Sequence, residues 1–369
     1  MDAGLYVHVP YCRHRCPYCD FNVWIDKHAP WAALADATVG DIGRRAAEFP
    51  YRFRSVYFGG GTPSLAPNAF FARVLEAADQ VLGLQGSAEV TMEIEPDTIS
   101  AARLRELVAL GVNRASLGWQ SSHDRLLKVL GRGHRADAAF RMFEDARNAG
   151  FDSVSIDLMF AVPGQTLAEL DADLDRIVAL SPDHVSLYAL TFEPDTEFER
   201  RRRRGRLVPT EDDLEAEMME HIESRLISAG YHHYEVSSYA KAGHAAVHNS
   251  GYWSGEPYLG VGPGAHSYRP TDSGAFRTMN RRRPGEYVAG TGFEWQEQLT
   301  PRQIVTERLL TAMRTTAGID VSTLPLLPED VVRAAEDAER RGWLTRDGVQ
   351  WRPTATGRRN ADALGALFA

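Results

Sequence analysis

The chain has 369 residues, a formal net charge of −9, 44% hydrophobic residues and 25% charged residues. This composition is typical of a globular protein with a large core, and the negative balance argues against a nucleic-acid partner. No apolar run reaches the length of about 18 residues that a membrane span needs, so we expect no transmembrane segment. The first residues lack the basic and apolar regions of a signal peptide, which predicts a cytoplasmic, reducing setting.

Short β-branched segments alternate with segments of helical periodicity through the first half of the chain. We expect strands at 5–9, 55–59, 89–94, 114–119, 153–160 and 184–190. We expect helices between them at 31–49, 68–82, 101–110, 136–149 and 167–180. Repeated strand–helix units predict an α/β fold with a parallel sheet, either open and doubly wound or closed into an incomplete barrel.

Three polar residues favour the barrel. Glu93, Gln120 and Asp157 lie within or at the end of predicted strands, amid apolar neighbours. In a flat sheet covered on both faces these side chains would be buried without purpose. In a barrel they can point into a polar interior or lie on its rim. We therefore predict a partial (β/α)6 barrel over residues 1–195.

The pattern changes after residue 195. A helix at 211–229, a strand at 231–239 and a glycine- and aromatic-rich stretch predict a segment over 196–298 that extends the barrel. The basic run at 200–204 is flanked by acidic residues, and we interpret it as a solvated helix end or loop. From 299 to 369, helices around a short hairpin predict a small winged-helix-like domain. It lacks a strongly basic recognition helix, so we interpret it as a packing or docking module.

All three cysteines lie in the stretch YCRHRCPYCDF, directly after the first predicted strand. Cys12, Cys16 and Cys19 are spaced C-x3-C-x2-C, and soft thiolates suit zinc, Cu(I) or an iron–sulfur cluster. Zinc would want a fourth ligand, which His8 or His14 could supply. A cubane cluster held by three cysteines would keep one iron open to a substrate or cofactor. Three thiols without a metal are the remaining interpretation.

The stretch YVHVPYCRHRCPYCDF resembles the signature of the radical S-adenosylmethionine (SAM) superfamily, and more narrowly its coproporphyrinogen dehydrogenase-like (HemN/HemW) family. The resemblance runs over nearly the whole chain and makes residues 196–298 a HemN-type segment. It implies a [4Fe-4S] cluster on the three cysteines and one or two SAM molecules. Reduction of the cluster by a donor such as flavodoxin or ferredoxin would cleave SAM to methionine and a 5′-deoxyadenosyl radical.

The same resemblance implies a set of SAM-binding residues. FGGGTPS matches the family's GGGTP motif, and glycines let the backbone approach a ligand closely. Arginine suits the carboxylate of SAM, and acidic or amide groups suit its ammonium or ribose. Taken alone, the glycines could form only a tight turn, and Asp157 could be a hydrogen-bonded strand carboxylate. The implied residues are Tyr6, Tyr18, Phe21, Gly60, Gly61, Thr62, Glu93, Gln120, Arg132 and Asp157.

HNSGYW resembles the HNxxYW motif that is associated with heme binding in the family. It implies that His248, Asn249, Tyr252 and Trp253 bind heme or another substrate. An imidazole can ligate heme iron, and aromatic faces can cover a porphyrin. Alternatively, the histidine and asparagine pin a glycine-rich loop by hydrogen bonds. His244 and His266 are further imidazoles nearby, so the axial ligand stays open.

Several residues depart from the family's usual pattern, and we expect them to face and reshape a substrate pocket. They are Ile94, Glu95, Trp119, Ser122 and Ala161, of which Trp119 is expected to contact heme or substrate. Such a pocket favours a class C methyltransferase or a cyclopropane-forming enzyme that uses two SAM molecules on a small molecule or peptide.

The HNxxYW motif favours a heme chaperone that passes heme to a hemoprotein acceptor. Porphyrinogen oxidation, as in the oxygen-independent coproporphyrinogen III dehydrogenases, is the least favoured activity. Those proteins carry a fourth cysteine where this chain has Phe21. The sequence assigns no catalytic residue and leaves the net substrate reaction open.

Overall fold

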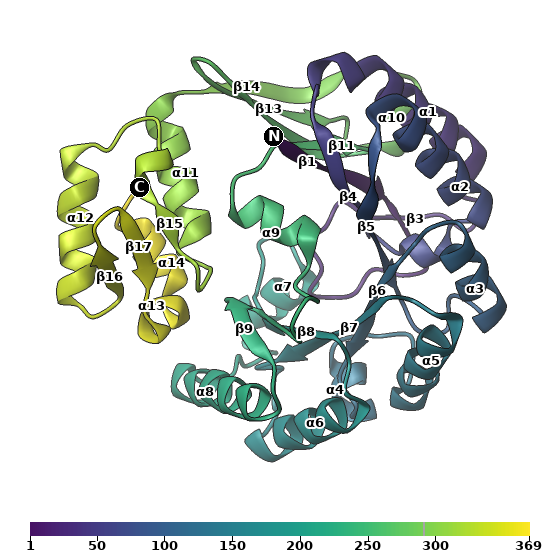
Figure 1. Ribbon diagram of the computed structural model, residues 1–369. Coiled ribbons are helices and arrows are strands. Elements are labelled where there is room, and N and C mark those ends of the chain that lie inside the picture. The colour runs from purple at the N-terminus through teal and green to yellow at the C-terminus, as the bar shows by residue number, and fades with distance from the viewer. Residues whose placement is uncertain (291) are drawn as a thin grey trace.

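The computed structural model describes residues 1–290 and 292–369. Six strands run parallel along one sheet: β1 (Asp2–Val9), β4 (Arg52–Gly60), β5 (Leu84–Ile94), β6 (Arg114–Gln120), β7 (Ser153–Phe160) and β8 (His184–Ala189). Helices cover the outside of this sheet: α1 (Trp31–Arg45), α2 (Asn68–Ala77), α3 (Ala101–Ala109), α4 (Asp124–Val129), α5 (Ala136–Ala149) and α6 (Leu167–Leu180). The sheet curls into an incomplete barrel (Figure 1), which confirms the predicted fold class.

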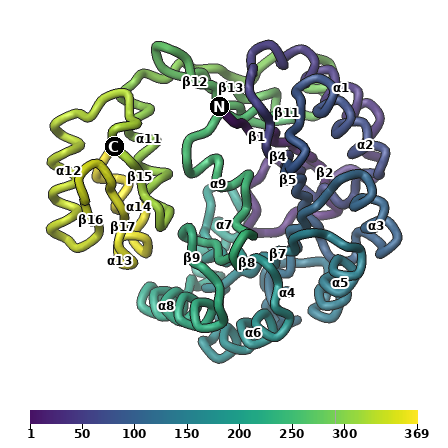
Figure 2. Tube along the Cα trace, viewed as in Figure 1, coloured from purple at the N-terminus to yellow at the C-terminus, as the bar shows by residue number. Residues whose placement is uncertain are grey.

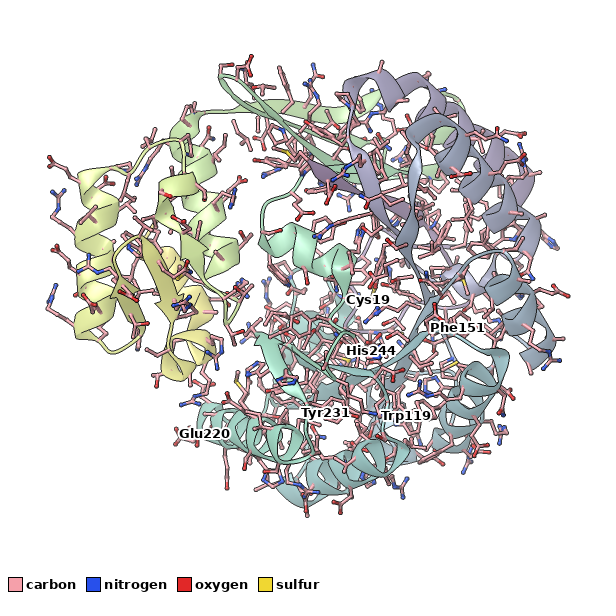
Figure 3. The ribbon with its side chains drawn as sticks, in the orientation of Figure 1. Cys19, Trp119, Phe151, Glu220, Tyr231 and His244 are labelled. Atoms are coloured by element: carbon pink, nitrogen blue, oxygen red, sulfur yellow. The ribbon has the colours of Figure 1, made fainter. Side chains whose placement is uncertain are left out.

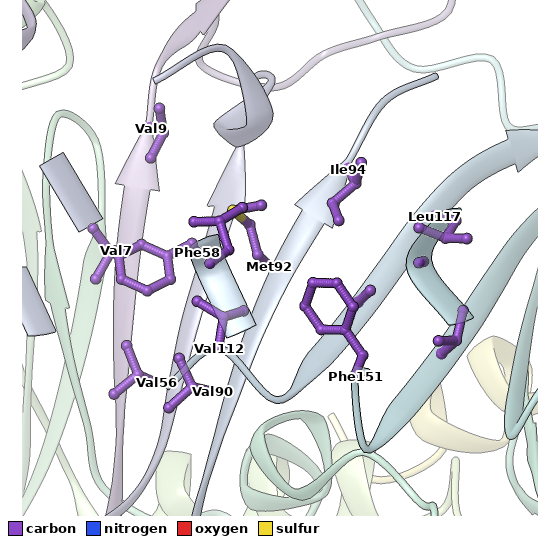
Figure 4. Packing of buried hydrophobic residues seen from close by; sticks show 14 of the residues in the cluster. Val7, Val9, Val56, Phe58, Val90, Met92, Ile94, Val112, Leu117 and Phe151 are labelled. Carbon is purple, nitrogen blue, oxygen red and sulfur yellow. The ribbon is translucent and has the colours of Figure 1, made fainter. Parts of the chain in front are cut away.

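Alternation along the strands separates the outer core from the barrel interior. In β1, Leu5 and Val7 are fully buried in the main hydrophobic cluster, whereas the intervening Tyr6 lines an internal cavity. Figure 4 shows the apolar layer made by β1, β4 and β5, and Ile94 belongs to it rather than to a substrate pocket. Because side chains alternate between the two faces of a strand, the polar residues between these positions point inward.

Six further strands extend the sheet at its two edges. On one side β11 (Tyr258–Val261) runs parallel to β1 and is followed by antiparallel β12 (His266–Thr271), β13 (Gly274–Asn280) and β14 (Phe293–Leu299). On the other side lie β9 (His232–Glu235) and β10 (Ser238–Ala240). The single strand expected at 231–239 is therefore wrong, because the chain turns at Val236 and Ser237 and pairs with itself. Glycines in the 248–268 stretch hid β11 from sequence analysis.

The segment after β8 supplies three helices and places a fourth in the open side of the barrel. These are α7 (Glu197–Arg203), α8 (Asp212–Ser228), α10 (Pro284–Val288) and, in the opening, α9 (Val247–Trp253). The arginine run forms the end of α7, where Arg200 and Arg201 pair with Glu197 one helical turn away. The interpretation as a solvated helix end is confirmed.

The chain ends in a small unit with its own core beside the open side of the barrel (Figure 2). Its elements are α11 (Pro301–Ala312), β15 (Ile319–Asp320), α12 (Glu329–Arg340), β16 (Leu344–Asp347), β17 (Gln350–Pro353), α13 (Ala355–Arg359) and α14 (Ala361–Ala366). The strands form a separate sheet, and Arg358 and Arg359 reach Glu223 of α8, both at 3.3 Å. Among the described residues, no helix is both long and apolar enough to cross a membrane.

Candidate functional site

The three cysteines lie on the loop after β1, at the carboxyl ends of the parallel strands, where barrel proteins place their sites. Two short strands, β2 (Tyr11–Cys12) and β3 (Trp24–Ile25), pair in parallel and close this loop. The backbone N–H of Cys19 donates to the carbonyl of Cys16 at 3.1 Å, so these two cysteines share a tight turn. All three thiols are free and partly exposed, and Cys19 lies within the ring of strands (Figure 3).

The surroundings of the thiols suit a bound cluster. The Thr62 hydroxyl donates to Cys12 Sγ at 3.4 Å, and the Arg132 guanidinium donates to Cys16 Sγ at 3.6 Å. A Cβ on Gly61 would lie 3.0 Å from Cys12 Sγ, so a glycine leaves room for the thiol here. Burial raises the pKa of Cys12 to about 11, because desolvation disfavours the thiolate. A bound metal centre would reverse this cost, since coordination deprotonates a thiol outright.

The histidines that could complete a zinc site are both engaged. Nε2 of His8 bonds to the carbonyl of Asn22 at 2.9 Å, and its Nδ1 lies 3.1 Å from the Tyr6 hydroxyl. Nε2 of His14 bonds to the carbonyl of Gly131 at 3.0 Å. Within the described chain no three His, Cys, Asp or Glu side chains are already grouped closely enough to hold a metal ion. The loop itself offers three thiols, and His14 Nε2 lies 3.9 Å from Cys16 Sγ. Three thiolates without a fourth protein ligand would leave one iron of a cubane open.

Glu93 lies on the inner face of β5, beside the glycine-rich loop. The Tyr57 hydroxyl donates to its Oε1 at 2.8 Å, and the backbone N–H of Gly60 donates to its Oε2 at 3.1 Å. Burial raises the pKa of this carboxyl to about 7, and the nearby Asp157 carboxylate adds to the shift. A ligand that brought an ammonium group would stabilise the ionised form of Glu93.

Arg132 lies between the cysteine loop and the ends of β5 and β6. Its guanidinium forms an ion pair with Glu95 and donates to the Tyr18 hydroxyl at 3.0 Å. Three side chains surround Gly118. A Cβ on this glycine would lie 3.1 to 3.4 Å from the nearest atoms of Glu95, Arg132 and Gln120. The structure thus brings together three of the expected SAM residues, namely Tyr18, Gln120 and Arg132. It adds Glu95, which occupies the guanidinium that the resemblance assigns to SAM.

Asp157 lies deeper in the barrel, on the inner face of β7. The Ser116 hydroxyl lies 2.9 and 3.1 Å from its two carboxylate oxygens. Burial raises the pKa of Asp157, while the hydroxyl bonds act against that shift. These bonds agree with a strand carboxylate satisfied within the protein, and its contact with the SAM ribose stays a prediction.

Trp119 and Ser122 point away from the barrel interior. Trp119 is 1% exposed, and its ring packs edge-on against Phe140 of α5 at 4.5 Å. The Ser122 backbone N–H donates to Asp173 of α6 at 2.7 Å. The strand is irregular here, since Gln120 has φ of +66° and the pairing with β7 shifts before it. Gln120 lies beside Gly118 with Arg132, whereas Trp119 packs in the helix layer. The expectation that Trp119 contacts heme or substrate is wrong, as is the expectation that Ser122 reshapes the pocket.

The HNSGYW segment forms α9, and its polar atoms are used to hold the helix in place. The backbone N–H groups of Val247 and His248 donate to the Glu89 carboxylate at 2.9 and 3.0 Å. His248 is 3% exposed, and its Nδ1 bonds with Ser55 Oγ and its Nε2 with the Tyr252 hydroxyl, both at 2.9 Å. Burial lowers the pKa of His248 to about 3, so the ring is neutral. Both ring nitrogens therefore serve the fold in this structure.

A cavity of about 1040 Å³ runs from the cysteine loop toward the antiparallel strands β12 to β14. Tyr6, Phe21, Gly60 and Glu93 line it on the side of the expected SAM site. Its volume is at the upper end of the range of about 300–1,000 Å³ typical of small-molecule sites. The lining on its other side is aromatic and carries charges of both signs: Tyr252, Glu256, Tyr258, His266, Tyr268, Arg277, Arg282, Trp295, Glu297, Glu307 and Arg308.

Only part of the HNSGYW segment lines the cavity. Of its residues, Tyr252 lines the cavity, whereas His248, Asn249 and Trp253 are not among the lining residues. The indole N–H of Trp253 is buried without a hydrogen-bond partner in the described chain. Heme or substrate contacts of Asn249 and Trp253 stay predictions.

Sequence reasoning missed Arg277, Arg282, Trp295 and Arg308 as candidate site residues. They come from β13, the turn after it, β14 and α11, none of which carries a recognisable motif. The one available signal was the alternation of polar and apolar residues in 293–299, which is typical of a strand with one solvated face.

Comparison with known proteins agrees with this geometry. Residues 6–177 match the Radical SAM superfamily, and residues 299–359 match the HemN C-terminal domain. The fold is similar to that of coproporphyrinogen III oxidase (HemN) from Escherichia coli, with a TM-score of 0.84 at 22% identity over 100% of this chain and 89% of that chain. Fold and site together define a radical SAM protein of HemN-type architecture.

Proteins of similar sequence show to which family within the radical SAM superfamily the chain belongs. The chain is 36% identical to the heme chaperone HemW of Bacillus subtilis over 85% of this chain and 84% of that protein. It is 34% identical to HemW of Escherichia coli over 99% and 97% of the two chains. It is also 37% identical to the mitochondrial radical S-adenosyl methionine domain-containing protein 1 of Bos taurus, over 86% and 74%. The chain belongs to the HemN/HemW family of radical SAM proteins.

Proposed function

We propose that this protein is a heme chaperone that binds heme and transfers it to a hemoprotein acceptor. The observation that carries the proposal is the cavity, which joins the expected SAM side to an aromatic wall that contains arginines. Flat aromatic side chains suit a porphyrin face, and arginines suit its propionate carboxylates. The relatives named heme chaperone HemW support heme as the cargo.

The cofactors of this proposal are a [4Fe-4S] cluster on Cys12, Cys16 and Cys19 and at least one SAM. When bound, the cluster would supply an iron open to the amino and carboxylate groups of SAM and an electron from a flavodoxin- or ferredoxin-type donor. Glu93 would accept the ammonium group of SAM, because its carboxylate lies buried and forms no ion pair with any residue that the structure describes. Arg132 would bind the SAM carboxylate after release from Glu95.

A second candidate is an enzyme that consumes SAM, such as a class C methyltransferase or a cyclopropane-forming enzyme. The observation that favours it is the volume of the cavity beside Glu93, which could take a second SAM next to the first. Porphyrinogen oxidation is the least favoured activity, because Phe21 is 59% exposed on the cavity edge where the resemblance places a fourth cysteine in dehydrogenases.

Anaerobic reconstitution of the full chain with iron and sulfide, followed by two assays, separates these functions. The first titrates heme, follows the Soret band, and then adds an apo-hemoprotein as acceptor. The second adds SAM and a reductant and quantifies 5′-deoxyadenosine and S-adenosylhomocysteine. Stoichiometric heme binding with transfer supports the chaperone. Multiple-turnover S-adenosylhomocysteine formation without heme binding would instead establish the enzyme.

A further inference from the structure

Three histidines lie close to the cavity, and two of them have no free ring nitrogen. His248 is bonded through both nitrogens to Ser55 and Tyr252. His8 is bonded through both nitrogens to Tyr6 and to the carbonyl of Asn22. Either histidine would have to break buried hydrogen bonds before it could bind a metal, and an unpaired buried partner would then remain.

His266 differs from both. It is exposed, it lines the cavity, and its ring makes no hydrogen bond within the described chain. The ring contacts Trp295 with a centroid distance of 5.6 Å and an interplanar angle of 52°.

The backbone holds His266 near the cysteine loop. The Asn22 side-chain amide donates to the carbonyls of Pro263 at 3.0 Å and Arg282 at 2.9 Å, tying the end of that loop to the turn before β12 and to the end of β13. Gly262 has φ of +98°, and a Cβ there would lie 2.3 Å from the carbonyl oxygen of His8. The turn therefore packs directly on the strand that leads into the cysteines.

Two of the three arginines in the cavity wall form no ion pair within the described chain, although Glu256, Glu297 and Glu307 line the same wall. Arg277 forms ion pairs with Glu297 and Glu307, but Arg282 and Arg308 have no ion pair with a carboxylate within the described chain. Burial lowers the pKa of Arg308, which marks a guanidinium poorly stabilised by its surroundings. An anionic ligand in the cavity would stabilise both guanidinium groups.

We propose that His266, rather than His248 of the HNxxYW motif, ligates the iron of bound heme, with Trp295 beside the ring and Arg282 and Arg308 facing the propionates. This inference rests on the proposed function, because it assigns the ligand of the same cargo. Binding would place the His266 lone pair on the iron without a change in protonation or oxidation state. The HNxxYW histidine would then act as a structural residue that holds α9 in the barrel.

The test titrates ferric heme into the full-length wild type and into His266→Ala, His266→Gly, His248→Gln and His232→Ala. His232 is an exposed histidine on β9, outside the cavity, and serves as the matched control. Electron paramagnetic resonance and resonance Raman spectra report the axial ligand, the Soret titration reports affinity, and circular dichroism reports folding. Each is independent of SAM turnover.

We expect both His266 variants to lose the imidazole-ligated spectrum and to bind heme about tenfold more weakly or worse. Added imidazole should restore the spectrum in His266→Gly. His248→Gln should unfold more easily but keep the ligation state of the wild type. The inference is overturned if His266→Ala keeps the wild-type spectrum, or if folded His248→Gln alone loses it. No heme binding by the wild type would instead refute the proposed function, and the axial-ligand assignment with it.

Arg282→Gln and Arg308→Gln test the propionate contacts separately. We expect weaker binding of heme but unchanged axial ligation, and a smaller loss with heme dimethyl ester, which lacks the carboxylates. An equal loss with both porphyrins would overturn the arginine assignment while leaving that of His266 intact.

Discussion

The cysteine loop and α9 both carry family motifs, but their polar atoms are used in opposite ways. On the loop, three thiols are free and partly exposed, and burial raises the pKa of Cys12 to about 11. On α9, both nitrogens of His248 and two backbone N–H groups are bonded inside the barrel. The thiols of the loop are therefore available to coordinate a metal, whereas the polar groups of α9 form hydrogen bonds that hold the helix in the barrel.

This difference shows that a motif alone does not say whether its residues bind a ligand or hold the fold. Removing a group that serves a ligand should abolish binding and leave the empty protein about as stable as before. Removing a group that serves the fold should do the reverse. The comparison can therefore be tested by measuring binding and unfolding on the same set of variants.

Cys16→Ser should have the largest effect on binding. It removes one of the three proposed cluster ligands, so the reconstituted variant should lose the visible absorption of an iron–sulfur cluster and bind less iron. The free energy of unfolding of the cluster-free chain should change by less than about 0.5 kcal/mol, because the side chain is partly exposed.

His14→Ala is the control for this variant, and it also tests the zinc interpretation. His14 bonds to the carbonyl of Gly131, so the cluster spectrum should survive its removal. Elemental analysis showing zinc in the wild type, together with loss of that zinc from His14→Ala, would contradict the three-thiol cluster.

His248→Ala should have the largest effect on stability. It leaves Ser55 and Tyr252 without their buried partner and opens a cavity beside Gly4, where the ring packs 3.0 Å from a Cβ position. We expect the cluster-free chain to lose about 2–4 kcal/mol in urea unfolding. His266→Ala is the matched control and should cost less than about 0.5 kcal/mol. Equal losses of unfolding free energy in the two variants would contradict the conclusion that His248 holds the fold and His266 does not.

The sequence predicted the strands of the barrel well, because their alternation with amphipathic helices is a strong local signal. β7 and α6 lie at the predicted residues, and α6 begins with a capping box from Thr166 to Glu169. The direction of Trp119 was not predictable in the same way. Its motif placed it at a strand end, but its direction depends on the irregular end of β6, where the pairing shifts and Gln120 has φ of +66°.

The far wall of the cavity was also beyond sequence reasoning. Arg308 and Trp295 line the same cavity only because α11 and β14 border the same space. The hydrogen bond of His248 Nδ1 likewise depends on Ser55, which lies far away in the chain. Local patterns identify such residues singly, but tertiary packing decides which ring nitrogen is left free.

Glu93→Gln should show that the carboxylate proposed to bind SAM lowers the stability of the ligand-free chain. The pKa of this carboxyl is about 7 in the folded chain against 4.5 in an unperturbed one. The folded state therefore holds the proton more tightly, so stability falls as pH rises from about 4.5 to about 7 and stays lowered above that. At about pH 8 the variant should be more stable than wild type by about 1–3 kcal/mol.

The measurement is urea unfolding of the cluster-free protein at about pH 5 and about pH 8, which bracket most of this range. Glu144→Gln on the exposed side of α5 is the control and should leave the pH dependence unchanged. A Glu93→Gln variant that is less stable than wild type at both pH values would mean that the carboxylate holds the fold, as Glu89 does for α9.

Ala161→Gly should give the smallest effect, at a buried residue of the main hydrophobic cluster that does not line the cavity. Ala161 follows β7 with φ of +55°, a left-handed conformation that a Cβ disfavours. Glycine at this position should therefore stabilise the chain by about 0.5–1 kcal/mol, measured by urea unfolding. Ala179→Gly in the last turn of α6 is the control and should destabilise by a similar amount, since its backbone is helical. Destabilisation by both variants would show that packing of the Ala161 methyl group stabilises the chain by more than the left-handed backbone destabilises it. Ala161 would then serve the fold, as the residues of α9 do.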